Sequence, residues 1–136
     1  MSVEVEQDYK LFQGDCFDVL PSIPDGSIDF ILTDPPYGCL KCEWDVKPDI
    51  RKFFQESRRV LKSNGAMAIF GCLPTSLDWI MEGRDWLKYE LIWSKTCAAN
   101  FPLSNKRPLC QHENIYIFIS GSNSEFHAQR FETGSG

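Results

Sequence analysis

Short runs of apolar residues recur along the chain, each bounded by glycine, proline or polar residues. Apolar runs of this length are typical of strands that are covered on both faces. Four of them occupy residues 28–32, 66–70, 89–93 and 115–119. A fifth candidate strand covers residues 10–13, directly before Gly-Asp.

Helical patterns fill several of the intervals between these strands. Residues 49–62 alternate charged positions with apolar residues at Ile50, Phe53, Phe54, Val60 and Leu61. This spacing predicts an amphipathic helix, and the following Ser-Asn-Gly supplies its C-terminal stop. Shorter helices are predicted over residues 16–20 and 75–82, whereas residues 94–113 are polar and irregular and are predicted to form a loop.

Alternation of strands and helices predicts an α/β fold with helices on both faces of a sheet. In such sheets ligands bind at the carboxyl ends of the strands. Asp15, Asp34, Gly71 and Ser94 each come directly after a predicted strand. If the strands are parallel, these four positions lie on one edge of the sheet, which is the first candidate site.

Composition limits the class of protein without naming it. The chain has 136 residues, of which 43% are hydrophobic and 13% aromatic, which suits a single packed domain. Its formal net charge of −5 argues against a protein that holds nucleic acid through a broad basic surface. A protein that acts on nucleic acid locally, through a pocket, is compatible with this charge.

The six cysteines favour reduced thiols in the cytoplasm. The first ten residues are charged and lack the apolar segment of a secretory signal. No apolar stretch approaches the roughly 20 residues that span a membrane, so no membrane association is expected. Cys39 and Cys42 form a CxxC, but no second pair follows at zinc spacing, so no metal site is predicted.

Residues 33–38, TDPPYG, end a predicted buried strand on a rigid corner that carries an acid and an aromatic ring. Pro35 and Pro36 have fixed φ angles and no amide hydrogens, so their carbonyls are presented stiffly as acceptors. The Asp34 carboxylate and a proline carbonyl would accept hydrogen bonds from an amine, and the Tyr37 ring would stack on a flat base. A base inside a duplex reaches such a pocket only when it is flipped out.

Several stretches of the chain, in this order, resemble the amino-methylating DNA methyltransferases, which methylate adenine N6 or cytosine N4. They are LFQGDCFDVLPSIPDGSIDFILTDPPYG, EWD, RRVLKSNGAMAIFG, KYELIWSK and NFPLSNKRPLCQHENIYIF. The likeness is to the N-terminal part of the group that places DPPY near the N-terminus, common in phage and restriction–modification enzymes. It implies a Rossmann-like sheet, S-adenosylmethionine as cofactor and double-stranded DNA as substrate.

The resemblance assigns roles to particular residues. It implies that Asp34, Pro35, Pro36 and Tyr37 are catalytic, holding the target amine and the flipped base. Asp34, where cytosine enzymes tend to have serine, favours adenine N6. Asp15 would lie near the cofactor adenine, or merely cap the helix that follows it.

Further implied positions lie later in the chain. Gly71 is a weaker cofactor-binding candidate. The substrate-side loop would contain four candidate nucleic-acid-binding residues, Asn100, Asn105, Lys106 and Arg107. A solvated loop is the alternative for these residues. His112 is a general base by residue type, although methyl transfer to a held amine needs none, and Glu113 is interpreted as structural.

The Gly-rich cofactor turn of this family has no counterpart on a predicted strand. Residues 1–119 are therefore predicted to form a partial catalytic core, and residues 120–136 a loop or the start of a missing target-recognition segment. Three interpretations stay open: a truncated product, half of a split enzyme, or a repurposed binding module. A homo-oligomer or a second chain that supplies the turn is expected, because missing strands leave an open sheet edge. Methylation of cytosine N4, of RNA or of a protein glutamine, and non-catalytic binding, are the alternatives.

Overall fold

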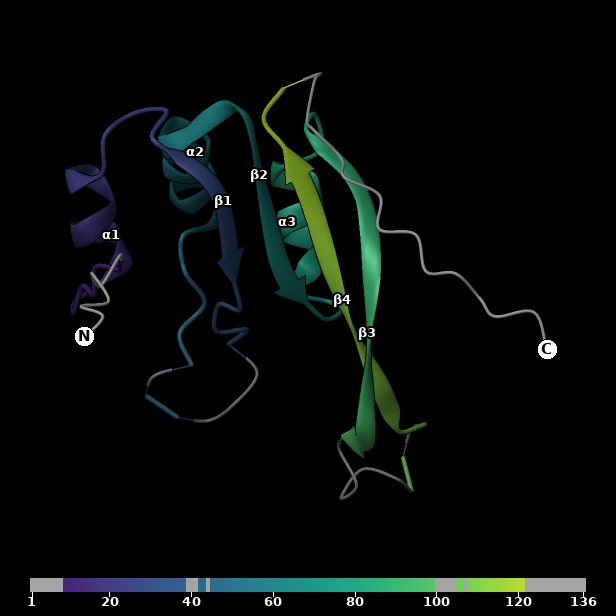
Figure 1. Cartoon of the computed structure of the whole chain (residues 1–136). Coiled ribbons are helices and arrows are strands. Elements are labelled where there is room, and N and C mark those ends of the chain that lie inside the picture. Colours follow the sequence, from purple (N-terminus) through teal and green to yellow (C-terminus); the bar gives the residue numbers. More distant parts are fainter. Residues whose placement is uncertain (1–8, 39–41, 44, 100–104, 107, 122–136) are drawn as a thin grey trace, which may run out of the picture.

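The computed structural model describes residues 9–38, 42–43, 45–99, 105–106 and 108–121. In this part of the chain no helix is long and apolar enough to cross a membrane. A four-stranded sheet forms the centre, in the order β1-β2-β4-β3 (Figure 1). The elements are α1 (Cys16–Val19), the 3-10 helix η1 (Leu20–Ser22), β1 (Ile28–Thr33), α2 (Ile50–Val60), β2 (Leu61–Gly71), α3 (Ser76–Glu82), β3 (Leu87–Ala99) and β4 (Cys110–Ile119).

Three of the strands run in one direction. β1 pairs with β2 in parallel, and β4 is antiparallel to both β2 and β3, so β3 runs the same way as β1 and β2. Thr33 pairs with Ile69, and Asn114 pairs with Gly71 on one side and Ile92 on the other. The carboxyl ends of β1 and β2 therefore lie at one edge, as expected for the candidate site.

α2 and α3 pack on the same face of the sheet. Phe54 from α2 and Trp79 from α3 join the strand residues Met67, Ile69 and Phe118 in one buried cluster. Phe17, from α1, packs against this cluster as well. We expected helices on both faces, but the described helices all contact this one face (Figure 1).

Two segments differ from the sequence-based expectation. Residues 10–13 form no strand, because they have no neighbouring strand to pair with among the described residues. The loop expected over residues 94–113 is shorter, since β3 continues to Ala99 and β4 begins at Cys110. Ser94 therefore lies inside β3, paired with His112, and does not follow a strand.

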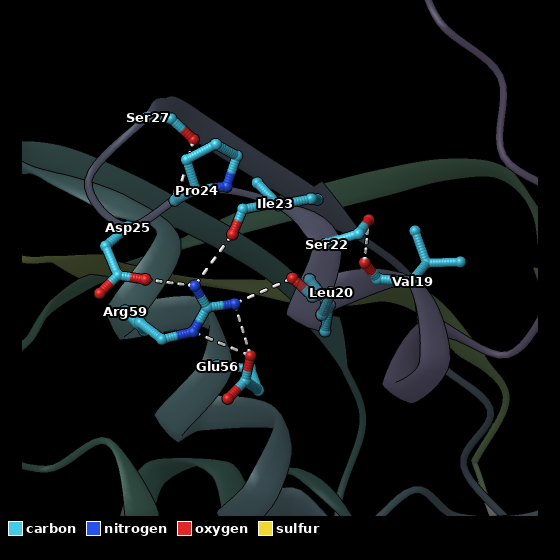
Figure 2. Close-up of polar contacts among 9 residues, drawn as sticks. All are labelled: Val19, Leu20, Ser22, Ile23, Pro24, Asp25, Ser27, Glu56 and Arg59. Carbon is cyan, nitrogen blue, oxygen red and sulfur yellow. Dashed lines mark hydrogen bonds and ion pairs between the residues drawn. The ribbon is translucent and has the colours of Figure 1, made fainter.

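The guanidinium of Arg59, near the end of α2, ties the segment before β1 to the helix layer (Figure 2). It donates hydrogen bonds to the backbone oxygens of Leu20 and Ile23 at 2.8 and 2.9 Å. It also binds the carboxylates of Asp25 and Glu56. The bonds from Arg59 hold η1, and with it α1, beside α2.

Candidate functional site

The TDPPYG corner begins where β1 ends at Thr33. The Tyr37 hydroxyl donates a hydrogen bond of 2.7 Å to Oδ1 of Asp34. Asp34 is exposed and Tyr37 is half-buried. A carboxylate accepts through both oxygens, so the bond from Tyr37 fixes the orientation of Asp34 and leaves it acceptor capacity.

Contacts from α3 and from Thr75, its N-cap residue, hold Tyr37 in place. The Thr75 hydroxyl donates to the Tyr37 carbonyl at 3.2 Å, and the Trp79 ring lies 5.7 Å from the Tyr37 ring, centre to centre. Burial and the hydrogen bond to the Asp34 carboxylate raise the pKa of Tyr37 far above its ordinary value. The phenol therefore stays protonated and remains a hydrogen-bond donor near neutral pH.

A buried acid closes the far side of the corner. Gly38 has a φ of +68°, the left-handed region that glycine adopts readily. Its amide donates to Oδ1 of Asp45 at 2.9 Å, and only 7% of Asp45 is exposed. Sequence reasoning did not assign Asp45 a role, although it belongs to the EWD segment that carries part of the resemblance.

A cleft of about 750 Å³ lies between the start of α1 and the corner. Asp15, Asp34, Pro35 and Pro36 line it, together with Lys47. Asp15 also caps α1, since its carboxylate accepts a hydrogen bond from the Phe17 amide at 2.8 Å. Of the two alternatives for Asp15, the helix cap is confirmed, and its position on the cleft leaves a role near the cofactor as a prediction.

A second cleft, of about 470 Å³, opens at the carboxyl end of β2. Gly71, Cys72 and His112 are among its lining residues. A Cβ on Gly71 would stand 2.6 Å from the Trp79 ring, so close packing alone requires glycine there. His112 is exposed in this cleft, and Glu113 forms an ion pair with Lys95.

The structure thus gathers part of the predicted site. Asp15, Asp34, Pro35 and Pro36 line the first cleft, and Tyr37 joins them through its hydrogen bond to Asp34, whereas Gly71 lies on the second cleft. Asn105 and Lys106 are exposed between β3 and β4, while Asn100 and Arg107 fall outside the described residues. Across the parts of the chain that the structure describes, no group of three or more histidine, cysteine or acidic residues is placed to hold a metal ion.

Two curated proteins share sequence with the chain. It is 30% identical over 112 residues to the type II methyltransferase M.HinfI of Haemophilus influenzae, a match that covers 63% of this chain and 31% of that protein. It is 24% identical over 138 residues to the type II methyltransferase M.BamHI of Bacillus amyloliquefaciens, covering 89% of this chain and 31% of that one. The chain therefore spans about a third of each relative. No protein-family model matches it.

Solved structures share the fold. The cytosine-N4-specific PvuII DNA methyltransferase superposes with a TM-score of 0.62 at 19% identity, covering 79% of this chain and 47% of that one. M1.HpyAVI in its complex with S-adenosylmethionine superposes with a TM-score of 0.61 at 15% identity, covering 92% and 62%. The chain thus has part of a Rossmann-like methyltransferase fold, and it resembles one part of the amino-methylating DNA methyltransferases.

Proposed function

We propose, on the basis of this resemblance to DNA amino-methyltransferases, that the chain binds the target base for transfer of a methyl group to the exocyclic amine of a flipped adenine. The observation that carries the proposal is the Asp34 carboxylate, exposed at the carboxyl end of β1 and oriented by the Tyr37 hydroxyl at 2.7 Å. Asp34 also lines a cleft large enough for a small-molecule ligand.

The chemistry of the corner suits an amine as methyl acceptor. Hydrogen bonds from the amine to Asp34 and to a proline carbonyl would direct its lone pair away from the protein and toward the methyl donor. Positioning of this kind supplies a large part of the rate in group transfer. The proton that the amine loses would leave through Asp34 or solvent, so the reaction needs no strong base such as His112.

The first cleft fits S-adenosylmethionine, the cofactor of this chemistry, in size and charge. Its volume of about 750 Å³ lies in the usual range for small-molecule sites. The carboxylates of Asp15 and Asp34 suit the positive charge of the cofactor's sulfonium and amino groups. When bound, the cofactor supplies an electrophilic methyl group.

Adenine N6 is the preferred target because an aspartate begins the DPPY corner. Cytosine N4 is the second candidate, since PvuII DNA methyltransferase, a solved structure of the same fold, is cytosine-N4-specific. Both bases present an exocyclic amine, so the geometry around Asp34 supports either. The identity of the methylated nucleoside separates the two.

The deciding experiment incubates the chain with unmethylated duplex DNA and S-adenosylmethionine that carries a labelled methyl group. Nucleoside analysis should find label in N6-methyladenine, and Asp34→Ala should reduce incorporation about 100-fold by removing the positioning acceptor. Asp29→Ala is the matched control, because Asp29 is an exposed acid on the same strand that pairs with Lys62 away from the corner. Label found only in N4-methylcytosine would refute the adenine assignment.

A binding experiment tests the acceptor site independently of methyl transfer. A duplex with adenine opposite an abasic site presents an amine-bearing base that flips at low cost, and a neighbouring 2-aminopurine fluoresces when that adenine leaves the stack. We expect binding with enhanced fluorescence, lost in Asp34→Ala. Binding without transfer would favour a non-catalytic module, and neither binding nor transfer would refute the proposed function.

A further inference from the structure

The face of the sheet opposite α2 and α3 is apolar, and we call it the open face. Five large exposed side chains flank it: Phe30 and Leu32 on β1, and Tyr89, Leu91 and Trp93 on β3. A small cluster that includes Ala68 and Ile117 lies between them. No helix of the described chain contributes to this cluster.

Strand register places these side chains on the same face. Phe30 and Leu32 pair with Ala66 and Ala68, while Tyr89 and Leu91 pair with Ile117 and Ile115. Directly paired residues project their side chains to the same side of a sheet. The Trp93 ring also contacts the Phe70 ring, with centroids 6.1 Å apart, which extends the surface toward the carboxyl end of β2.

The exposed apolar area is large for a free surface. Leu32 is 65% exposed, Trp93 55%, Phe30 54%, Leu91 49% and Tyr89 46%. These fractions amount to about 500 Å² of apolar side chain, divided between a strip on β1 and a strip on β3 with the buried Ala68 and Ile117 between them. Sheets with parallel strands, such as β1 and β2, are normally covered on both faces.

We propose that the open face binds an amphipathic α-helix of a partner polypeptide. β1 and β3 are separated by three strand spacings, about 14 Å, which accommodates a helix about 10 Å across. The short Ala66 and Ala68 side chains lie beneath its path, and the aromatic and leucine side chains of β1 and β3 rise on either side. Helices laid on a mixed α/β sheet are the usual cover for such a face.

A second copy of the chain is a poorer occupant. Two open faces stacked together would bury about 1,000 Å² in total, below the roughly 1,200–2,000 Å² of stable specific interfaces. Each copy also carries a formal charge of −5, so the two would repel. A partner that carries both a helix for the open face and a strand for the edge of β1, which has no neighbouring strand in the described chain, would bury more area than two stacked faces do.

The test uses a fluorescently labelled helical peptide of leucine, glutamate and lysine, about 18 residues long and without net charge. Its leucines are spaced i, i+3, i+4, i+7 to form one apolar face. The control peptide has the same composition in an order that scatters the leucines. By fluorescence anisotropy, we expect the patterned peptide to bind at least tenfold more tightly than the control.

Variants of the chain assign the binding to the open face. Leu32→Lys and Leu91→Lys should each weaken binding of the patterned peptide at least tenfold. Leu77→Lys should not, because Leu77 is a similarly exposed leucine on α3, at 51%. Circular dichroism melts identify any variant that fails to fold.

Three results would overturn the proposal: equal binding of the two peptides, unchanged binding by both open-face variants, or no binding up to about 200 µM. Self-association of the chain in sedimentation, abolished by Leu32→Lys and Leu91→Lys, would also overturn it by making a second copy the occupant. The assay contains neither DNA nor S-adenosylmethionine. Its outcome is therefore independent of the methyl-transfer experiment.

Discussion

Tyr37 is assigned two tasks: its hydroxyl orients Asp34, and its ring stacks on the flipped base. Substitution by phenylalanine and by alanine separates the two. Tyr37→Phe keeps the ring but removes the hydroxyl bond to Asp34, which is worth about 0.5–1.5 kcal/mol at this half-buried position. Tyr37→Ala also removes the ring, and loss of base stacking costs a further 1–3 kcal/mol or so. In a fluorescence titration with the 2-aminopurine duplex, Tyr37→Phe should weaken binding of the duplex about 2–10-fold. Tyr37→Ala should weaken it roughly a further 5–150-fold.

The control is Tyr89→Ala, which removes an exposed tyrosine from the open face and should leave affinity for the duplex unchanged. Tyr37→Ala also loses the ring contact with Trp79, so its thermal melt is recorded and binding is measured well below the melting temperature. Equal losses in Tyr37→Phe and Tyr37→Ala would show that the ring does not stack on the base. Wild-type affinity in Tyr37→Ala would refute both tasks.

Four further predictions concern the same region. Asp45→Ala should lower stability to urea by about 1–3 kcal/mol, because it removes a buried charged acceptor from the corner; an unchanged midpoint would contradict this. Gly71→Ala should lower thermal stability by about 1–3 kcal/mol through collision with Trp79, and a higher melting temperature would refute the packing argument. Because the pKa of Tyr37 is raised by folding, its contribution to stability is complete below the unfolded value of about 10 and is lost as the pH rises above it. Between pH 9 and pH 11, the free energy of unfolding measured with urea should therefore fall less for Tyr37→Phe than for wild type. If Lys106 contacts phosphate, Lys106→Ala should reduce the slope of log binding constant against log salt concentration by about 1. An identical slope would place Lys106 away from the DNA backbone.

Local sequence determines much of this fold. The apolar run at 28–32 forms most of β1, the run at 66–70 forms the C-terminal half of β2, and the helical spacing at 49–62 becomes α2, which ends at Val60. These elements are predictable because burial imposes a period on neighbouring residues. The rigid corner at 33–38 is equally local, since its prolines act on their own backbone.

Pairing between distant segments was not predictable in this way. Residues 94–99 begin with the polar Ser94, Lys95 and Thr96, yet the whole segment extends β3, where Ala99 pairs with Cys110 across a long hairpin. Residues 10–13 have the composition of a strand but no neighbour among the described residues. In both places the backbone hydrogen bonds of a second segment decide the outcome, and propensity supplies only a weak prior.

The site shows the same division between local and distant information. Asp34 was identified because it follows the predicted strand that becomes β1, whereas the strand predicted before Asp15, at residues 10–13, does not form. Asp45 and Thr75 were missed because their contacts to the corner span 7 and 38 residues of sequence. A periodic pattern in the sequence does not predict such contacts, because they form only when distant segments of the chain pack together in the fold.

Two features bear together on the proposed chemistry: the open face, and the edge of β1, which has no neighbouring strand among the described residues. A strand added in parallel to that edge would end beside Asp34, because the carboxyl ends of parallel strands share one edge of a sheet. A Gly-rich turn at the end of such a strand would then face the first cleft, and a helix from the same partner would cover Phe30 and Leu32. On this argument, a partner that binds the open face should raise the affinity of the chain for S-adenosylmethionine, while Leu32→Lys should lower that gain without altering the Asp34 corner. Calorimetric titration of the chain with S-adenosylmethionine, with and without the partner, measures this gain. Equal affinities in the two titrations would show that the open face does not influence cofactor binding.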